Sequence, residues 1–256
     1  MAGVTFHVDG RVAHVTLDRP DHMNAITSDM DDALAAAWAR INGDPDIWCA
    51  ILSASGDRAF CIGADMTGGR SGSARMAFGG GLTGVGGPLV TLEKPLIAAV
   101  QGFCVGGGFE LVMCADIIVA ADTAEFGLPE TKVGIIGECG VVHRAVRQLP
   151  HRIAMAMILT GKRLKATDAE RFGLVNEIVP AAGLGDAAVR WAAAVTKASP
   201  LANQAAKAAA LARLGHSLEE ALMTRFEAIE RYADSDDNRE GAAARAEGRK
   251  PVWTGR

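Results

Sequence analysis

The chain is organised around the segment Gly102-Phe103-Cys104-Val105-Gly106-Gly107-Gly108-Phe109-Glu110. An apolar run at 95–100 precedes it and predicts a buried strand, and an apolar, helix-like run at 110–115 follows. Three glycines before a helix leave backbone N–H groups uncovered and let a ligand approach the main chain. Such N–H groups can bind a carbonyl oxygen, and Glu110 beyond them could transfer a proton. The pattern also fits a structural turn in which Glu110 only favours the helix start.

A second carboxylate has a similar place farther along the chain. The apolar run 116–122 predicts another buried strand, which leads into Phe126-Gly127-Leu128-Pro129-Glu130. A glycine-bearing turn at 131–140 then leads into a further helix. Glu110 and Glu130 each lie at the edge of an apolar segment, so both are candidate catalytic residues.

Outward from this centre, strand and helix patterns alternate. Asp9-Gly10 between two alternating runs predicts a hairpin over 5–17. A helix should begin near Thr27 or Ser28, with one apolar face made of Met30, Leu34, Ala37, Trp38 and Ile41. The run 48–53 predicts a buried strand. Strand, turn and helix recur up to about residue 180, which indicates an α/β fold.

The last third of the chain is predicted to be helical. Ala-rich segments predict helices at about 185–197, 200–214 and 217–233, after a last strand at 175–180. Capping boxes are predicted at Thr167 with Glu170 and at Ser217 with Glu220; such helices could pack on their own subunit or on a neighbour's.

Residues 67–88 differ from the rest, because glycine and serine dominate them. They predict a mobile loop, with a short helix around 73–78, that could act as a lid or binding loop. A linker between two domains is the alternative, but the strand–turn–helix rhythm resumes unchanged after Leu92.

Composition narrows the class of protein. The 256 residues are 49% hydrophobic and carry a net charge of −4. The most basic stretch, Arg144–Arg152, holds only three arginines, so a nucleic-acid partner is not expected. No run is long enough for a membrane span, and the first residues lack a basic region followed by a hydrophobic block. The five cysteines form no C-x-x-C pair. A cytoplasmic protein without membrane contact or structural disulfides is therefore predicted.

Several familiar motifs are missing from the sequence. It contains no phosphate-cradling G-x-x-x-x-G-K-[ST], no dinucleotide-binding G-x-G-x-x-G and no nucleophile elbow G-x-S-x-G. The six histidines show no metal-ligand spacing, so no metal is predicted.

Four segments together resemble the enoyl-CoA hydratase/isomerase (crotonase) superfamily. They are Arg19-Pro20 followed by Asn24-Ala25, then 59–66, 102–110 and 126–134. The resemblance implies a spiral of ββα units with a helical trimerisation region, divided as a core at 1–195 and a helical region at 196–256. It also implies a homotrimer or a homohexamer.

The resemblance further implies an acyl-CoA thioester substrate. The N–H groups of Ala64 and Gly107 would form the oxyanion hole for its carbonyl oxygen. Coenzyme A would be part of the substrate, so no separate cofactor is expected. The residues implied to contact the substrate are Ile62, Gly63, Asp65, Met66 and Gly106.

The two glutamates direct the prediction toward one reaction. True hydratases of this superfamily carry carboxylates at the positions of Glu110 and Glu130, where they hold a water between them, and isomerases usually retain one. The expected activity is an enoyl-CoA hydratase, a hydro-lyase that adds water reversibly to a 2-enoyl-CoA and gives a 3-hydroxyacyl-CoA. An enoyl-CoA isomerase, an RNA-binding relative and a non-catalytic scaffold are the alternatives.

The sequence departs from the usual hydratase pattern after Glu130. The segment 134–141 lacks the usual proline and carries Glu138 in place of a small residue. Together with the tail 249–256, it resembles the branch that contains carnitinyl-CoA dehydratase, also called crotonobetainyl-CoA hydratase. Glu138 could contact a cationic or polar acyl group, or it could be an acid at a helix N-terminus.

Overall fold

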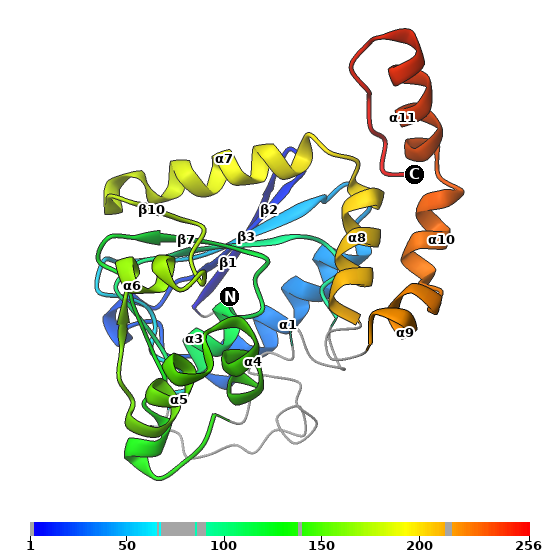
Figure 1. Ribbon diagram of the computed structural model, residues 1–256. Coiled ribbons are helices and arrows are strands. Elements are labelled where there is room, and N and C mark those ends of the chain that lie inside the picture. The colour runs from blue at the N-terminus through cyan, green and yellow to red at the C-terminus, as the bar shows by residue number, and fades with distance from the viewer. Residues whose placement is uncertain (1–2, 66, 68–84, 86–90, 138–139, 213–216) are drawn as a thin grey trace.

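The computed structural model describes residues 3–65, 67, 85, 91–137, 140–212 and 217–256. Two sheets form the centre of the fold, with strand orders β1-β2-β3-β5-β7-β10 and β4-β6-β8-β9 (Figure 1). The strands are β1 (Val4–Asp9), β2 (Val12–Leu17), β3 (Cys49–Ala54), β4 (Ala59–Cys61), β5 (Leu96–Val100), β6 (Phe103–Val105), β7 (Ile117–Ala121), β8 (Glu125–Gly127), β9 (Leu164–Lys165) and β10 (Glu177–Val179).

From β3 to β8, consecutive strands alternate between the two sheets. β3, β5 and β7 lie in the larger sheet, and the strand after each of them, β4, β6 or β8, lies in the smaller one. Neighbouring strands are parallel except in the pairs β1–β2 and β8–β9. The chain therefore winds as a spiral of repeated strand–strand–helix units, and the predicted α/β class is confirmed.

The central strands are buried on both faces, as expected for parallel sheets. Successive residues alternate between the faces, so Cys49 and Ile51 pack beneath α7 (Leu184–Thr196), whereas Ala50 and Leu52 point toward the space between the sheets. Figure 1 shows α7 running along one face of the larger sheet. The opposite face packs on α1 (Ser28–Gly43) and on α3 (Gly107–Val112). The core thus reaches the start of α3.

The helix α1 forms as its sequence predicts. Thr27 is the N-cap, and its hydroxyl accepts a hydrogen bond from the Met30 N–H at 3.3 Å. The five predicted apolar side chains of this helix are all buried: Met30, Leu34, Ala37, Trp38 and Ile41.

Two predictions about the later helices are wrong. The helix near Thr167 begins earlier, at Ala166, whose N–H bonds to Ala124 O at 2.9 Å; Thr167 is therefore inside the first turn and caps nothing. The segment 217–233 is not one helix. Residues Thr224 and Phe226 are extended, which lets the second helix turn and pack against the helix that starts at Pro200. The capping box at Ser217 is confirmed.

The remaining helices follow in chain order. They are α4 (Val141–Gln148), α5 (His151–Thr160), α6 (Ala166–Arg171), α8 (Pro200–Ala212), α9 (Leu218–Met223), α10 (Glu227–Ala233) and α11 (Asp236–Glu247), with the 3₁₀ turns η1 (Pro20–His22), η4 (Glu130–Val133) and η5 (Ala181–Gly183). None of the helices in the described ranges is long and apolar enough to cross a membrane.

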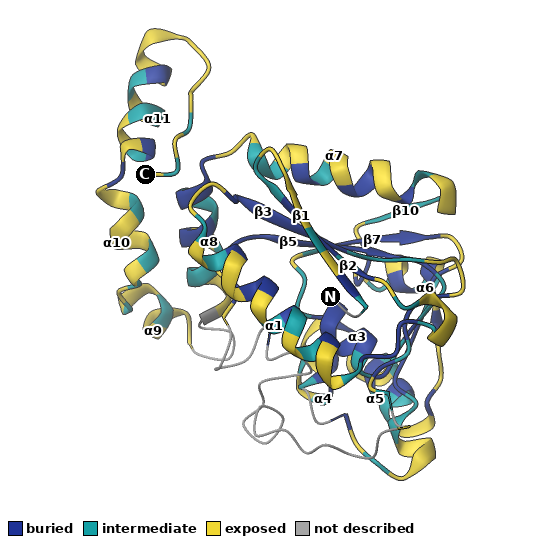
Figure 2. Cartoon of the chain, turned by 180° about the vertical axis from the view of Figure 1, so that it is seen from behind, coloured by how far each residue is buried: buried dark blue, intermediate teal, exposed yellow. Residues whose placement is uncertain are grey.

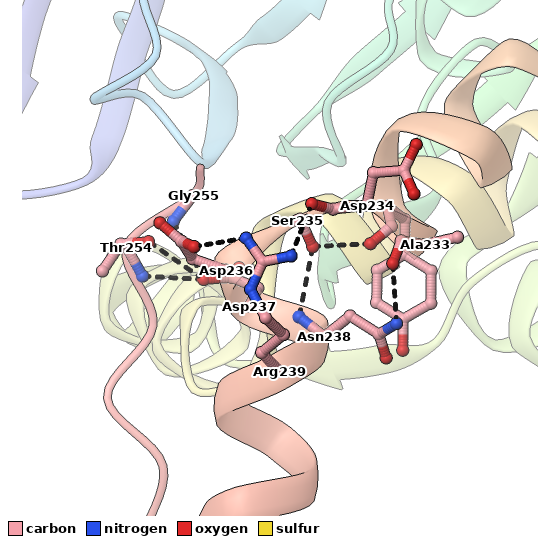
Figure 3. Close-up of polar contacts among 10 residues, drawn as sticks. Ala233, Asp234, Ser235, Asp236, Asp237, Asn238, Arg239, Thr254 and Gly255 are labelled. Carbon is pink, nitrogen blue, oxygen red and sulfur yellow. Dashed lines mark hydrogen bonds and ion pairs between the residues drawn. The ribbon is translucent and has the colours of Figure 1, made fainter.

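The C-terminal tail returns along α11 and is fixed by one buried carboxylate. Figure 2 shows α11 at a distance from the sheets, with many exposed residues. Asp237, near its start, accepts hydrogen bonds from Thr254 N–H at 2.8 Å, Gly255 N–H at 3.1 Å and the Ser199 hydroxyl at 2.8 Å. Figure 3 shows Asp237 between the helix and the returning tail. This acid therefore joins α8, α11 and the last residues of the chain.

Candidate active site

The parallel pairing of β4 with β6 brings two glycine-bearing turns together. Both strands end at the same edge of the smaller sheet, so the segment after Cys61 leaves beside the segment after Val105. Gly63 has a φ of +100°, and a Cβ on it would lie 2.9 Å from the Gly107 nitrogen. A Cβ on Gly108 would lie 2.3 Å from the Cys61 oxygen. The two main chains therefore approach more closely than side chains would allow.

This approach leaves two N–H groups available on adjoining segments. The Ile26 N–H donates to Gly63 O, and Ile26 O accepts from the Asp65 N–H, both at 2.8 Å. Ala64 lies between Gly63 and Asp65 in the chain, so its N–H points away from Ile26. Gly107 is the first residue of α3, and its N–H has no intrahelical acceptor. Across the described ranges, no hydrogen bond uses either N–H as donor. The predicted oxyanion hole needs such a pair; its role stays a prediction.

The two candidate catalytic glutamates face a common point. Glu110 lies in the first turn of α3 and is 5% exposed, and Glu130 begins η4, three residues after the end of β8. A Cβ on Gly137 would lie 3.1 Å from Glu110 Oε1 and 3.5 Å from Glu130 Oε1. A Cβ on Gly106 would lie 3.6 Å from the same Glu130 oxygen. Glycine at 137 therefore keeps the space between the two carboxylates open.

The two carboxylates have different surroundings. Glu110 Oε1 accepts a hydrogen bond from the Val141 N–H, at the start of α4, at 3.4 Å. Glu130 Oε1 is buried, and no atom of the described residues donates to it. Burial raises the pKa of Glu130 above its ordinary value. A buried acceptor without a partner is suited to a water or a substrate hydroxyl.

Asp65, predicted to contact the substrate, is held by the protein itself. Its Oδ1 accepts from the Thr67 hydroxyl at 2.6 Å and from the Thr67 N–H at 2.9 Å, and its Oδ2 accepts from Arg19 at 2.6 Å. The Thr67 hydrogen bonds, followed by the Arg19 contact, hold the pKa of Asp65 well below its ordinary range. These contacts fix the chain after Ala64. The predicted contact with substrate stays a prediction.

Asn24 supports the site, although sequence reasoning gave it no role. It is fully buried with a φ of +54°. Its Oδ1 accepts from the Arg19 N–H at 2.8 Å, and its Nδ2 donates to Ser55 O and Ala59 O, both at 3.0 Å. Asn24 thus ties the start of β4 to the segment that pairs with Ala64. The only signal in the sequence is the spacing of Arg19-Pro20 and Asn24-Ala25.

The other predicted residues differ in what the structure says of them. Ile62 is half-buried, and Gly63 and Gly106 are buried beside the two N–H groups. Met66, Glu138 and most of the predicted loop at 67–88 lie outside the described residues. Among the described residues, no group of three or more His, Cys, Asp or Glu side chains could hold a metal ion.

Comparison with known proteins gives the class to which this fold and site belong. A family model described as enoyl-CoA hydratase/isomerase matches residues 7–256, so the chain belongs to that family. The expectation of the crotonase superfamily and of a hydro-lyase of the enoyl-CoA hydratase type is thereby confirmed.

Named relatives span nearly the whole chain. An (E)-benzylidenesuccinyl-CoA hydratase of Thauera aromatica is 35% identical over 98% of this chain and 99% of its own length. A carnitinyl-CoA dehydratase of Proteus mirabilis is 38% identical over 96% of both chains. Both names describe hydration or dehydration of an acyl-CoA.

Solved structures agree with this. A protein of Novosphingobium aromaticivorans, provisionally described as a short-chain enoyl-CoA hydratase, is 66% identical, with a TM-score of 0.92 over 100% of this chain and 99% of its own. An enoyl-CoA hydratase of Mycobacterium tuberculosis is 35% identical, with a TM-score of 0.91 over 100% of both chains.

Proposed function

We propose that this chain adds water reversibly to a 2-enoyl-CoA and releases a 3-hydroxyacyl-CoA. The observation that supports this most is the placement of Glu110 and Glu130, whose Oε1 atoms both lie within 3.5 Å of the point where a Cβ on Gly137 would stand. Hydration needs one group to take a proton from water and another to supply a proton to carbon. Moving a double bond needs a single base and no water. Two facing carboxylates therefore favour hydration over isomerisation.

In the proposed mechanism, the N–H groups of Ala64 and Gly107 bind the thioester oxygen. They stabilise the negative charge that develops there when water adds to the β-carbon and an enolate forms. Glu110 and Glu130 hold the water between them; one takes its proton and the other protonates the α-carbon. Ile62, Gly63 and Gly106 would line the path of the coenzyme A part of the substrate.

A hydration assay tests this proposal. Crotonyl-CoA loses the absorbance of its conjugated thioester when water adds, so turnover is followed directly in the ultraviolet. The enzyme should consume crotonyl-CoA and give 3-hydroxybutyryl-CoA, identified by mass. Conversion of 3-butenoyl-CoA to crotonyl-CoA, without hydration, would instead support the isomerase.

A second candidate is hydration of a cationic acyl group. The relatives described as carnitinyl-CoA dehydratase, up to 39% identical over 97% of the chain, favour it. Crotonobetainyl-CoA assayed beside crotonyl-CoA separates the two candidates. A higher kcat/KM for crotonobetainyl-CoA, lost in Glu138→Gln, would support the cationic substrate.

The region 196–256 is further proposed to assemble a homotrimer or a homohexamer. Leu218, Leu222 and Met223 of α9 are each at least 75% exposed, and large apolar side chains so exposed commonly lie at an interface. Light scattering should give the mass of three or six chains, and a 26.6 kDa monomer would contradict the proposal.

A further inference from the structure

The Arg19 guanidinium bridges two neighbouring segments of the site. Its Nη1 donates to Ala25 O at 3.1 Å and to Asp65 Oδ2 at 2.6 Å. The Arg19 side chain is 25% exposed and the Asp65 side chain 12%, so the ion pair is largely shielded from water. A charge-assisted hydrogen bond in such a place is stronger than an ion pair in open solvent. The bridge therefore holds Asp65 against the segment 25–26.

This bridge lies beside the backbone that carries the Ala64 N–H. Ala64 is exposed, and its neighbours Gly63 and Asp65 both bond to the main chain of Ile26. Gly63 has a φ of +100°, and a glycine gives the chain little stiffness of its own. The direction of the Ala64 N–H therefore depends on how firmly the residue after it, Asp65, is held.

Arg19 has a fixed base from which to hold Asp65. Its N–H donates to Asn24 Oδ1 at 2.8 Å, and its backbone oxygen accepts from the Asn24 N–H at 3.0 Å. Asn24 is fully buried, and its Nδ2 donates to Ser55 O and to Ala59 O, the first residue of β4. Arg19 is thus tied to the strand that leads into Gly63. A catalytic donor must be held within about 0.5 Å of its productive place, and this network supplies such a hold.

The bridge also controls a charge close to the predicted oxyanion hole. Asp65 directly follows Ala64, whose N–H would face the oxygen that becomes negative in the enolate. An unpaired carboxylate so near would oppose that negative charge, because like charges repel over several ångströms in a partly shielded site. Pairing with the Arg19 guanidinium removes most of this repulsion.

We propose that Arg19 and Asp65 are a positioning pair, which orients the Ala64 N–H toward the thioester oxygen and neutralises the carboxylate beside it. Neither side chain has to touch the substrate for this. The second Asp65 oxygen, Oδ1, is already used by the Thr67 hydroxyl at 2.6 Å and the Thr67 N–H at 2.9 Å. This inference rests on the proposed function, because it assumes that the thioester oxygen lies at the N–H groups of Ala64 and Gly107.

The polarisation of a bound thioester tests the proposal directly. Butyryl-CoA has the thioester but no double bond, so it cannot add water, and a carbon-13 label on its carbonyl separates its infrared band from those of the protein. The wild type should shift this band to lower frequency on binding, because hydrogen bonds to the oxygen weaken the C=O bond. At saturating butyryl-CoA, Arg19→Met should lose about half of this shift or more, and Arg19→Lys should lose less, since an ammonium still pairs with Asp65.

The kinetics of crotonyl-CoA hydration should follow the band. In Arg19→Met, kcat should fall about 10- to 100-fold, as for a donor displaced by a fraction of an ångström, and KM should stay within about threefold. Asp65→Asn keeps an oxygen for Thr67 and leaves no unpaired carboxylate, so its kcat should fall less. The double variant should lose no more than Arg19→Met alone, because the two side chains act through one contact. Losses that multiply in the double variant would overturn the pair.

The control is Arg171→Met on α6. Arg171 is exposed and pairs with Asp168 at 3.0 Å, so it too is an arginine that holds a carboxylate, but outside the site. This variant should keep the wild-type band and a kcat within about twofold. If Arg19→Met does not fold, band and kcat are measured in Arg19→Lys and Asp65→Asn, and values unchanged in both overturn the proposal.

Other outcomes separate this inference from the proposed function. An unchanged band in Arg19→Met overturns the pair and leaves hydration standing. A higher KM with unchanged kcat in Asp65→Asn also overturns the pair, because Asp65 would then contact the substrate. A wild type that shifts the band but does not hydrate crotonyl-CoA overturns hydration, and loss of that shift in Arg19→Met still supports the pair. A wild-type band that does not move on binding overturns the oxyanion hole and the pair with it.

Discussion

Glu130 and Asp237 are two carboxylates with buried oxygens and opposite surroundings. Asp237 is 1% exposed, and its oxygens accept from Ser199, Thr254 and Gly255. Glu130 Oε1 is buried without a donor among the described residues, and burial raises the pKa of this acid. An acid whose hydrogen bonds are complete fixes structure, whereas an acid left incomplete is available to a ligand. The comparison separates structural acids from reactive ones by their hydrogen bonds rather than by burial.

The largest effect, on kcat, is expected when Glu130, the acid whose Oε1 has no donor, is replaced by a neutral residue. Glu130→Gln keeps the shape of the side chain but cannot exchange a proton, so kcat on crotonyl-CoA should fall about 100- to 10,000-fold. Glu110→Gln should cause a loss of similar size. Steady-state rates, with circular dichroism to show that each variant is folded, provide the measurement.

The control for this loss is Glu125→Gln. Glu125 lies on β8, five residues before Glu130, and pairs with Arg163 at 3.3 Å. Its removal should leave kcat within about twofold of the wild type, as for most changes outside the chemistry. If either active-site glutamine variant keeps kcat within threefold, the two-carboxylate mechanism is wrong.

The complete acid should affect stability and leave the chemistry alone. Asp237→Ala strands the N–H groups of Thr254 and Gly255, so the free energy of unfolding should fall by about 1–3 kcal/mol. The kcat of the folded enzyme should stay within about twofold of the wild type. Urea unfolding followed by tryptophan fluorescence, at one protein concentration, measures the change.

Asp236→Ala is the matched control for Asp237→Ala. Asp236 is the next residue toward the N-terminus, and its exposed carboxylate pairs with Arg239 at 2.6 Å. An exposed pair of this kind contributes below about 1 kcal/mol. Equal losses in the two variants would show that burial and hydrogen bonding do not distinguish these neighbours.

The features that could be predicted from the sequence are those that depend on residues close together in the chain. The Asp9-Gly10 turn, the helix start near Thr27 or Ser28 and the Ser217 capping box depend on residues a few positions apart, and all three are confirmed. The turn at Thr224–Phe226 was missed, because it depends on how α10 packs against α8. The capping box predicted at Thr167 is wrong for a similar reason, because the hydrogen bond from the Ala166 N–H to Ala124 O lets the helix start earlier.

The residues of the candidate site could be predicted from the sequence, but the different surroundings of Glu110 and Glu130 could not. The glycine turn and the two glutamates could be picked out from the sequence and from the family resemblance. Their convergence depends on the parallel pairing of β6 with β8 and on a glycine at 137. The missing donor at Glu130 Oε1 depends on packing between distant segments, which no local pattern encodes.

A smaller effect, on the free energy of unfolding, is expected when Asp237 loses one of its hydrogen-bond donors. Ser199→Ala removes the hydroxyl that donates to Asp237 and accepts from the Ala202 N–H at 3.1 Å, so the free energy of unfolding should fall by about 1 kcal/mol. Thr196→Ala is the control, because the Thr196 hydroxyl bonds within its own helix, to Ala192 O at 3.0 Å. Its effect should stay within about 0.5 kcal/mol. If Ser199→Ala lowers the free energy of unfolding no more than Thr196→Ala does, the hydrogen bond from Ser199 to Asp237 does not stabilise the fold.

The smallest effect concerns the stability of the fold, which the raised pKa of Glu130 makes dependent on pH. The pKa of Glu130 is raised above the ordinary value of 4.5, so between these two values the folded state binds more protons than the unfolded state. Stability therefore falls as the pH rises through this window, and the destabilisation is fully present above it. Glu130→Gln cannot ionise, so its Tm near neutral pH should exceed that of the wild type by about 1–2 °C. The gain should vanish at a pH of about 4, where Glu130 is mostly protonated in both states. A gain that persists there, or a lower Tm near neutral pH, would mean that ionisation of Glu130 does not destabilise the fold and that its carboxylate is not the incomplete acid of this comparison.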